Sequence, residues 1–331
     1  MSGPQPANYG TITKTFHWLT ALLILTVIPL GAVANRLPYE TNEQLAFKAQ
    51  LFSFHKTLGL IVFFVALARI LWAFGQPKPG ELHPERKLET WLAELVHWLL
   101  YISLDAVPMT GCIHHAATEG FAPHSQPFSL ELPFVPNDAG VAKLFGGLHW
   151  VWSKIMVASI LLHVAGALKH QIIDKDATLR RMWFGGKNLP TVDPHKGSKA
   201  APIAALFVYV LATGAGAAAG MYSKPESTVE QVALAEVASE WTVDEGQIAL
   251  TITQFGSAVS GSFGEWTSAI RFDENATDVM GDVETTISIG SLSLGTVTND
   301  ALGSDFFNAE AFPTALFTAD LKREGDAFVA D

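Results

Sequence analysis

Five long apolar runs constrain this chain more than any other feature of its sequence. Each run is close to the ~20 residues that an α-helix needs to cross the hydrocarbon core of a bilayer. The runs cover residues 16–35, 52–74, 91–113, 144–168 and 201–221. We therefore expect a multi-pass membrane protein in this part of the chain.

Basic residues in the connections indicate how these runs are oriented, because cytoplasmic loops are rich in Lys and Arg. Most of the basic residues lie between the second and third runs or after the fourth: Lys78, Arg86, Lys87, Lys169, Lys175, Arg180, Arg181, Lys187, Lys196 and Lys199. The connection between the third and fourth runs holds only Lys143, and Arg36 and Lys48 give a weaker opposing signal. We expect a cytoplasmic N-terminus in a bacterial inner membrane, with the C-terminal segment in the periplasm.

The C-terminal segment differs from the rest of the chain in charge and pattern. Residues 1–200 carry 17 Lys/Arg against 13 Asp/Glu, whereas residues 201–331 carry 4 against 19. After a linker at 222–238, apolar and polar residues alternate between short Gly-, Asp- and Asn-containing turns, which predicts an antiparallel sheet or barrel. No strong basic stripe is present, so we expect no nucleic-acid partner. A single cysteine, Cys112, excludes an intramolecular disulfide and covalent c-type haem.

Histidines within the apolar runs are the strongest functional signal, since ionisable residues are costly in a bilayer and usually serve a function. The first four runs and their ends carry His17, His55, His97, His149, His163 and His170. A b-type haem needs two imidazoles that face one another across a helical bundle with apolar walls.

Two of these histidines share one face of the fourth run. His149 and His163 are 14 residues apart, which is within about 40° of whole helical turns and about 21 Å along the axis. Because successive runs alternate in direction, His55 lies level with His149, and His17 lies level with His163. The spacing predicts two facing pairs, one near each membrane surface, that ligate the iron of two haem b groups.

Other polar residues leave alternatives open. His97 lies toward the same membrane side as His17 and could replace it as a ligand. Arg69, 14 residues after His55, could pair with a haem propionate or simply extend to the interface. His170 could donate a proton to a quinone or be a solvated interfacial residue.

Two glycines support the pairing, since Gly59 and Gly166 follow His55 and His163 closely and would let a flat ring approach the backbone. The remaining histidines near the outer connection lack the fixed spacing of a metal site and are expected to be exposed loop residues. They are His114, His115 and His124.

The part of the chain with four histidine-bearing runs resembles the prokaryotic cytochrome b561 family over about residues 9–185. The matching stretches are FHWLTALLI, FHKTLGLIVFFVALARILW and LHVAGALKHQIIDKDATLRRM. The resemblance implies a four-helix bundle with two b haems that moves electrons between a periplasmic partner and the quinone pool. The family's haem ligands match His17, His55, His149 and His163. One branch of the family oxidises superoxide and reduces ubiquinone, and His170 resembles its quinone-side histidine.

The C-terminal segment resembles the YceI-like family over about residues 239–331. The matching stretches are SEWTVDEGQIALTITQFGSAVSGSFGEW, AIRFDEN and GSDFFNAEAFPTALF. The resemblance implies a lipocalin-like barrel around an isoprenoid or quinone-type lipid. Since the sequence ends at AFVAD, where the family continues with more strands, we expect an incomplete barrel and a truncated sequence.

Together these features predict an all-α transmembrane four-helix haem bundle and a fifth transmembrane helix, followed by an incomplete antiparallel β domain. The expected parts are a membrane domain at 9–185, a cytoplasmic linker at 186–200, the fifth helix at 201–221, a linker at 222–238 and a β domain at 239–331. The expected function is electron transfer from a periplasmic donor, such as superoxide, to ubiquinone near Arg69 and His170. The alternatives are a non-catalytic cytochrome b subunit of a dehydrogenase and a lipid-binding carrier anchored by the cytochrome.

Overall fold

The structure of the chain is a computed structural model. It describes residues 5–6, 8–38, 41–118, 132, 134–136, 138–185, 189–193, 197–223, 232–235, 237–239, 241, 243–254, 257–276, 279–324 and 327–330. The chain forms two compact units, one made chiefly of residues 1–223 and the other chiefly of residues 224–331.

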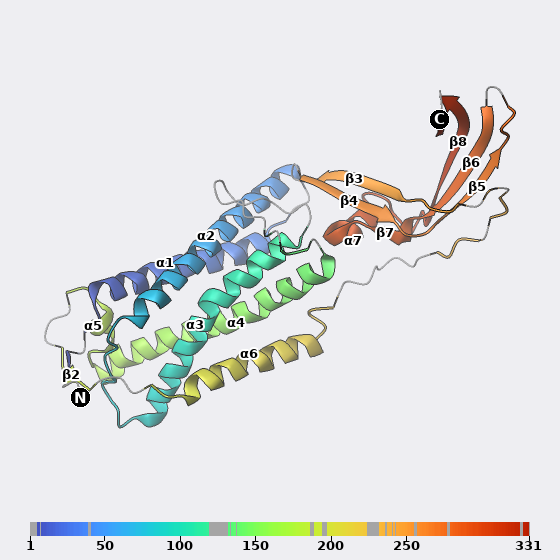
Figure 1. Ribbon diagram of the computed structural model, residues 1–331. Helices are drawn as coiled ribbons and strands as arrows, with labels where there is room; N and C mark the ends of the chain where they lie inside the picture. The colour runs from blue at the N-terminus through green and yellow to red at the C-terminus, as the bar shows by residue number, and fades with distance from the viewer. Residues whose placement is uncertain are drawn as a thin grey trace. The chain divides into compact units, whose positions relative to one another are not determined.

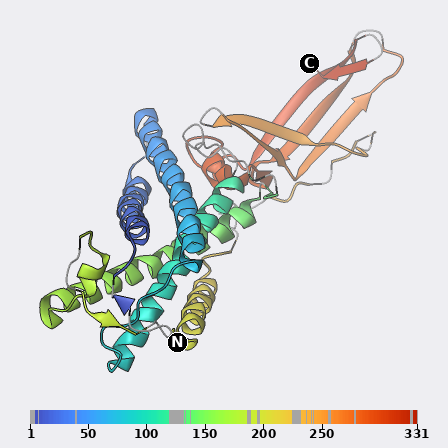
Figure 2. The same cartoon turned by 60° about the vertical axis from the view of Figure 1, so that its left-hand side comes forward.

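Within the described residues, the first unit contains five helices that are long and apolar enough to cross a membrane. They are α1 (Thr11–Arg36), α2 (Asn42–Phe74), α3 (Lys87–Ala116), α4 (Ala139–Lys169) and α6 (Ala200–Ala218). A five-residue π-helical turn, His170–Asp174, continues α4 without a break. Figures 1 and 2 show these helices packed as a bundle, with α6 alongside α3. The expected set of five apolar helices is confirmed.

Helix α2 extends well beyond the apolar run that predicts it. It begins at Asn42, ahead of the run at 52–74, because a capping box starts it there. The backbone N–H of Gln44 donates to the Thr41 hydroxyl at 3.3 Å, and the Gln44 side chain accepts from the Thr41 backbone N–H at 3.3 Å. These bonds satisfy donors that the first turn of a helix leaves open.

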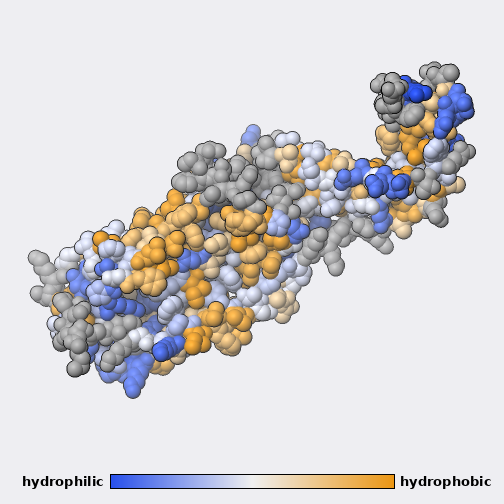
Figure 3. Space-filling view, in the orientation of Figure 1, coloured by the Kyte–Doolittle hydropathy of each residue, from blue (hydrophilic) through white to orange (hydrophobic). Residues whose placement is uncertain are grey.

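Many large apolar side chains lie on the outside of the bundle. Large side chains that are 64–69% exposed include Leu22, Leu25, Leu71, Leu161 and Ile203. The buried core between the helices consists of Ile24, Val27, Val62, Ala66, Leu104, Val107 and Met156. Figure 3 shows apolar residues over the sides of the helices. Such a surface suits contact with hydrocarbon rather than water.

Helix α6 is held to the bundle by buried polar contacts. The hydroxyl of Tyr209 lies 2.5 Å from that of Ser103 on α3 and donates to the backbone carbonyl of Leu99 at 3.2 Å. On α4, Trp152 Nε1 donates to the Thr213 hydroxyl at 3.0 Å. Because unpaired polar groups are costly in a bilayer, these contacts make the fifth helix part of the bundle as well as a link to the second unit.

Short elements close one end of the bundle. They are α5 (Thr178–Met182) and the antiparallel two-residue strands β1 (Gln5–Pro6) and β2 (Thr191–Val192). Trp18 Nε1 on α1 donates to the Met182 carbonyl at 2.8 Å, and Lys14 Nζ donates to the Trp183 carbonyl at 2.9 Å. The start of α1 is thereby fixed to the segment that follows α4.

The second unit consists of antiparallel strands, as the sequence predicts. One sheet contains β3 (Ile248–Gln254), β4 (Ser257–Phe263) and β7 (Leu292–Ser293), in that order. The other contains β5 (Trp266–Phe272), β6 (Val279–Ser288), β8 (Thr314–Glu324) and β9 (Ala327–Ala330), in that order. The described strands form two sheets rather than a closed barrel.

A compact apolar core lies beside the first of these sheets. It is formed by Val259, Phe263, Ile289, Leu292, Leu294, Ala301, Leu302 and Ala309. The short helix α7 (Thr298–Leu302) and the 3₁₀ turns at Ile289–Ser291 and Gly295–Val297 supply several of these residues. The antiparallel β fold expected for this segment is therefore present.

We expect Tyr209→Phe to lower the free energy of unfolding by about 1 kcal/mol, because it removes a buried hydrogen bond between two membrane helices. Tyr222→Phe is the matched control, since the Tyr222 hydroxyl is buried without a hydrogen-bond partner among the described residues. Thermal unfolding in detergent measures both variants. Equal stability of the two would contradict a docking role for Tyr209.

Candidate functional site

Two histidines from α2 and α4 face one another and form the α2–α4 pair. The ring centres of His55 and His149 are 6.2 Å apart, and the ring planes are 89° apart. His55 Nδ1 donates to the carbonyl of Val27 on α1, and His149 Nδ1 donates to that of Val107 on α3, both at 2.9 Å. A carbonyl can only accept, so each Nδ1 carries the proton and each Nε2 keeps a lone pair suited to a metal ion.

Glycines give the two rings access to these carbonyls. Gly31 lies four residues after Val27, and a Cβ there would lie 2.5 Å from Cε1 of His55. Gly111 lies four residues after Val107, and a Cβ there would lie 3.0 Å from Nδ1 of His149. In a helix, the residue at i+4 lies next to the carbonyl of residue i and donates its backbone N–H to it. When that residue is a glycine, no side chain covers the carbonyl, so the carbonyl can also accept a hydrogen bond from a histidine ring.

The other pair comes from α1 and α4 and is called the α1–α4 pair. The ring centres of His17 and His163 are 6.1 Å apart, with 60° between the planes. His97 on α3 lies even closer to His163, with 5.1 Å between ring centres. Arg69 lies over the ring of Tyr101 at 5.7 Å. The structure therefore brings His17 and His163 together and also leaves His97 beside them.

These distances allow a test of whether the residues fit haem. Two imidazoles that bind one metal ion from opposite sides, each through a bond of about 2 Å, have ring centres about 6 Å apart. Both pairs meet this condition, and the core residues around them are apolar. A Cβ added at Gly59 or Gly166 would meet no protein atom within 4 Å, which leaves space for a flat group at these positions. The residues present fit the group.

His114 was expected to be an exposed loop residue, and that prediction is wrong. It lies in the last turn of α3 and is partly buried, because its Nδ1 donates to the carbonyl of Ala142 on α4 at 2.7 Å. A Cβ at Gly146, again four residues further on, would lie 3.0 Å from the ring. His115 is likewise partly buried at the end of α3, and His124 lies outside the described residues.

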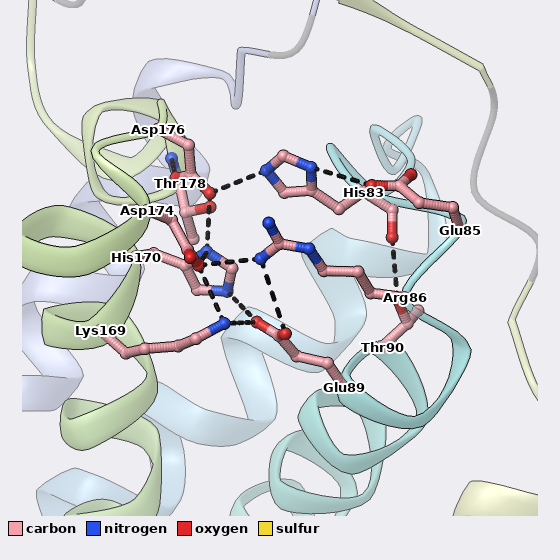
Figure 4. Close-up of polar contacts among 10 residues, drawn as sticks. All are labelled: His83, Glu85, Arg86, Glu89, Thr90, Lys169, His170, Asp174, Asp176 and Thr178. Atoms are coloured by element: carbon pink, nitrogen blue, oxygen red, sulfur yellow. Dashed lines mark hydrogen bonds and ion pairs between the residues drawn. The ribbon is translucent and has the colours of Figure 1, made fainter.

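Beyond the α1–α4 pair, charged residues from the start of α3 and the end of α4 form one cluster, shown in Figure 4. We call it the His170 cluster, and it consists of His83, Arg86, Glu89, Lys169, His170, Asp174 and Asp176. His170 Nδ1 lies 2.6 Å from Asp176 and 3.1 Å from Asp174, and its Nε2 lies 3.1 Å from Glu89. Both ring nitrogens are therefore engaged by carboxylates.

The carboxylates of this cluster are balanced by nearby cations. Lys169 Nζ lies 2.5 Å from Glu89 and 2.9 Å from Asp174, and Arg86 lies 3.0 Å from Asp174. Ligand atoms of Glu89, His170 and Asp174 lie within 4.8 Å of one another, as a metal site would require. Because the two cations already occupy the carboxylates, we interpret the cluster as an ion-pair network.

Asp176 is the best-supported anion of the cluster. Burial raises the pKa of its carboxyl, but hydrogen bonds from the backbone N–H of Thr178, at 2.8 Å, and from His170 outweigh burial and lower that pKa to about 2. The carboxylate therefore stays ionised at neutral pH and accepts a hydrogen bond from His170.

Arg69 and His170 were expected to serve one quinone site. The structure places them in different surroundings, since Arg69 lies against Tyr101 and His170 lies among carboxylates. None of the contacts among the described residues joins the two. Lys154, deep within α4, is exposed and lies 4.7 Å from the centre of the Trp150 ring.

Comparison with known proteins covers both units. Residues 8–185 match the family model of prokaryotic cytochrome b561, and residues 241–328 match that of the YceI-like domain. Cytochrome b561 homolog 2 of Escherichia coli (strain K12) is 33% identical over 179 residues, which is 54% of this chain and 92% of the relative. Cytochrome b561 homolog 1 of the same organism is 26% identical over 166 residues, 50% of this chain and 91% of the relative. Probable superoxide oxidase CybB of Yersinia pestis is 24% identical over 181 residues, 53% of this chain and 95% of the relative.

We expect Gly31→Ala to reduce the haem bound per chain, because the new methyl group would displace the His55 ring from the Val27 carbonyl. Gly214→Ala is the matched control, since a Cβ on that helix α6 residue meets no atom within 4 Å. Haem quantification on both purified variants measures the effect. Unchanged haem content in Gly31→Ala would show that this ring position is not required.

Proposed function

Because the chain belongs to the prokaryotic cytochrome b561 family, and is therefore a membrane electron-transfer protein, we propose that it transfers electrons from a periplasmic donor to ubiquinone. The observation that carries the proposal is the presence of two histidine pairs with ring centres 6.1 and 6.2 Å apart. The two pairs share one helix and lie at different depths, so together they span much of the bilayer.

The family implies haem b, and the proposal is that the chain binds two. His17 and His163 would hold one, and His55 and His149 would hold the other. A haem b with two histidine ligands supplies reversible one-electron chemistry and leaves no open iron position for oxygen. The carbonyls of Val27 and Val107 orient the rings of the α2–α4 pair and set their tautomer. Arg69 supplies a fixed positive charge near the α1–α4 pair.

Ubiquinone would be reduced at the end of the bundle that holds the α1–α4 pair, which we place on the cytoplasmic side. Reduction of one quinone to quinol takes two electrons, from two molecules of a one-electron donor, and two protons from the cytoplasm. The His170 cluster is suited to hold such protons, because His170 lies within 3.1 Å of three carboxylates. His170 would hold a proton on the quinone side, and Arg69 would stabilise negative charge there.

Superoxide is the proposed donor at the opposite, periplasmic end. The name of the Yersinia pestis relative, probable superoxide oxidase, supports this choice. Lys56 directly follows His55 in α2 and places a cation beside the α2–α4 pair, where it would attract an anion. The YceI-like unit would lie in the periplasm and hold an isoprenoid or quinone-type lipid.

The haem proposal predicts that substitution of a histidine in either pair removes one haem from the protein. We expect two b haems per chain, with one remaining in His149→Ala and one in His163→Ala, because each substitution removes a residue that would hold one of the haems. Reduced-minus-oxidised spectra with haem quantification measure both. His83→Ala, outside the pairs, should keep two. Loss of one haem in His97→Ala but not in His17→Ala would assign His97 as the ligand instead.

The donor proposal is tested by stopped-flow spectroscopy of the purified protein. Superoxide should reduce the haem within the mixing experiment, and added ubiquinone analogue should reoxidise it. Superoxide dismutase should abolish the reduction by superoxide, whereas protein that has been reduced beforehand by a chemical reductant should still be reoxidised by the ubiquinone analogue at an unchanged rate. A protein with both haems that superoxide fails to reduce would exclude superoxide as the donor. Failure of ubiquinone to reoxidise the reduced protein would exclude it as the acceptor.

A further inference from the structure

A pocket of about 300 Å³ lies between α3 and the segment that leads into α6. Its walls come from Glu94, His97, Trp98 and Tyr101 on α3, and from Ser198 and Lys199 before α6. Lys78, in the connection between α2 and α3, also lines it. The volume is at the lower end of the range usual for small-molecule sites.

Specific contacts hold the two sides of the pocket together. The carboxylate of Glu94 accepts the backbone N–H of Ser198, with distances of 3.0 and 3.3 Å to its two oxygens. Further along the same helices, the bond between Ser103 and Tyr209 fixes α6 against α3. The family match ends at residue 185, so the pocket depends on a segment that the matched four-helix part lacks.

The pocket reaches the α1–α4 pair through His97. His97 lines the pocket, and its ring centre lies 5.1 Å from that of His163. Tyr101, one helical turn further on, stacks with His97 at 6.4 Å and also contacts Arg69. A molecule in this pocket would therefore lie one side chain away from a proposed redox centre.

The side chains around the pocket combine flat aromatic surface with hydrogen-bond donors. Trp98 and Tyr101 offer ring faces, while His97, Ser198 and Lys199 offer donors. Lys78 and Lys199 add positive charge at the end of the bundle where α3 begins. An aromatic molecule with two carbonyl oxygens, which gains negative charge on reduction, matches this set better than a purely apolar or purely anionic ligand does.

We propose that this pocket binds the head group of a quinone, with its isoprenoid tail leaving along the apolar faces of α3 and α6. The inference rests on the proposed function and assigns its quinone site to the fifth helix. The His170 cluster then serves as a nearby proton store, since both nitrogens of His170 are already engaged. His97 and Lys199 are the residues that would donate to the quinone oxygens.

Photolabelling tests the location on the full-length protein in nanodiscs. An azido-ubiquinone analogue should label peptides that contain residues 94–101 and 197–202, and excess decylubiquinone should suppress that label. Labelling of the His170 cluster instead, or labelling that decylubiquinone does not suppress, would overturn the assignment. Because the label is read by mass spectrometry, the result is independent of electron-transfer activity.

Binding measurements test the side chains. We expect Trp98→Leu and Lys199→Gln each to raise the Kd of decylubiquinone about tenfold, as expected for loss of one ring contact or charged donor. Lys87→Gln is the matched control, because Lys87 is exposed at the start of α3 and does not line the pocket. Unchanged haem spectra show that the variants fold. Wild-type affinity in both variants would overturn the proposal.

Two further outcomes separate this proposal from others. If Lys199→Gln lowers retention of phosphatidylglycerol, as measured by native mass spectrometry, and leaves decylubiquinone binding unchanged, the pocket is an anionic-lipid site and the quinone assignment is wrong. If the wild-type protein lacks haem but still takes up the photolabel in the pocket, the proposed function fails while the binding site stands.

Discussion

The hydrogen bonds from histidine Nδ1 atoms to backbone carbonyls of neighbouring helices are the interactions on which the site depends. An imidazole inside a bilayer has no water to satisfy its N–H, so the partner must come from the protein. Helix carbonyls are usually covered by the next turn. Gly31 leaves the carbonyl of Val27 on α1 accessible, and Gly111 does the same for Val107 on α3. These two carbonyls orient the histidine rings of α2 and α4.

The same arrangement recurs a third time, at His114, Ala142 and Gly146. Three separate helix contacts therefore have the same arrangement. In each, a histidine ring on one helix donates to a backbone carbonyl on a neighbouring helix, and a glycine follows that carbonyl residue by four positions. At His114 the motif joins the last turn of α3 to α4, so it also serves helix packing.

Much of this could be predicted from the sequence because the bilayer imposes strict rules. Apolar length gives the five helices, and the 14-residue spacing of His149 and His163 gives two levels on one face. The role of Gly31 could not be predicted, since it depends on which helix lies against His55. The contact of Arg69 with Tyr101 could not be predicted for a related reason: helical periodicity gives the depth and face of a residue, whereas its side-chain partners depend on packing. The burial of His114 likewise follows from a contact with α4.

Helix α4 contributes one histidine to each pair, and this has a geometric consequence. The helix between His149 and His163 rises about 21 Å, and this rise sets the distance between the two pairs along the helix axis. A residue inserted between them would turn one imidazole by about 100° relative to the other. The number of residues between His149 and His163 therefore fixes both the distance between the two pairs along the helix and their relative direction.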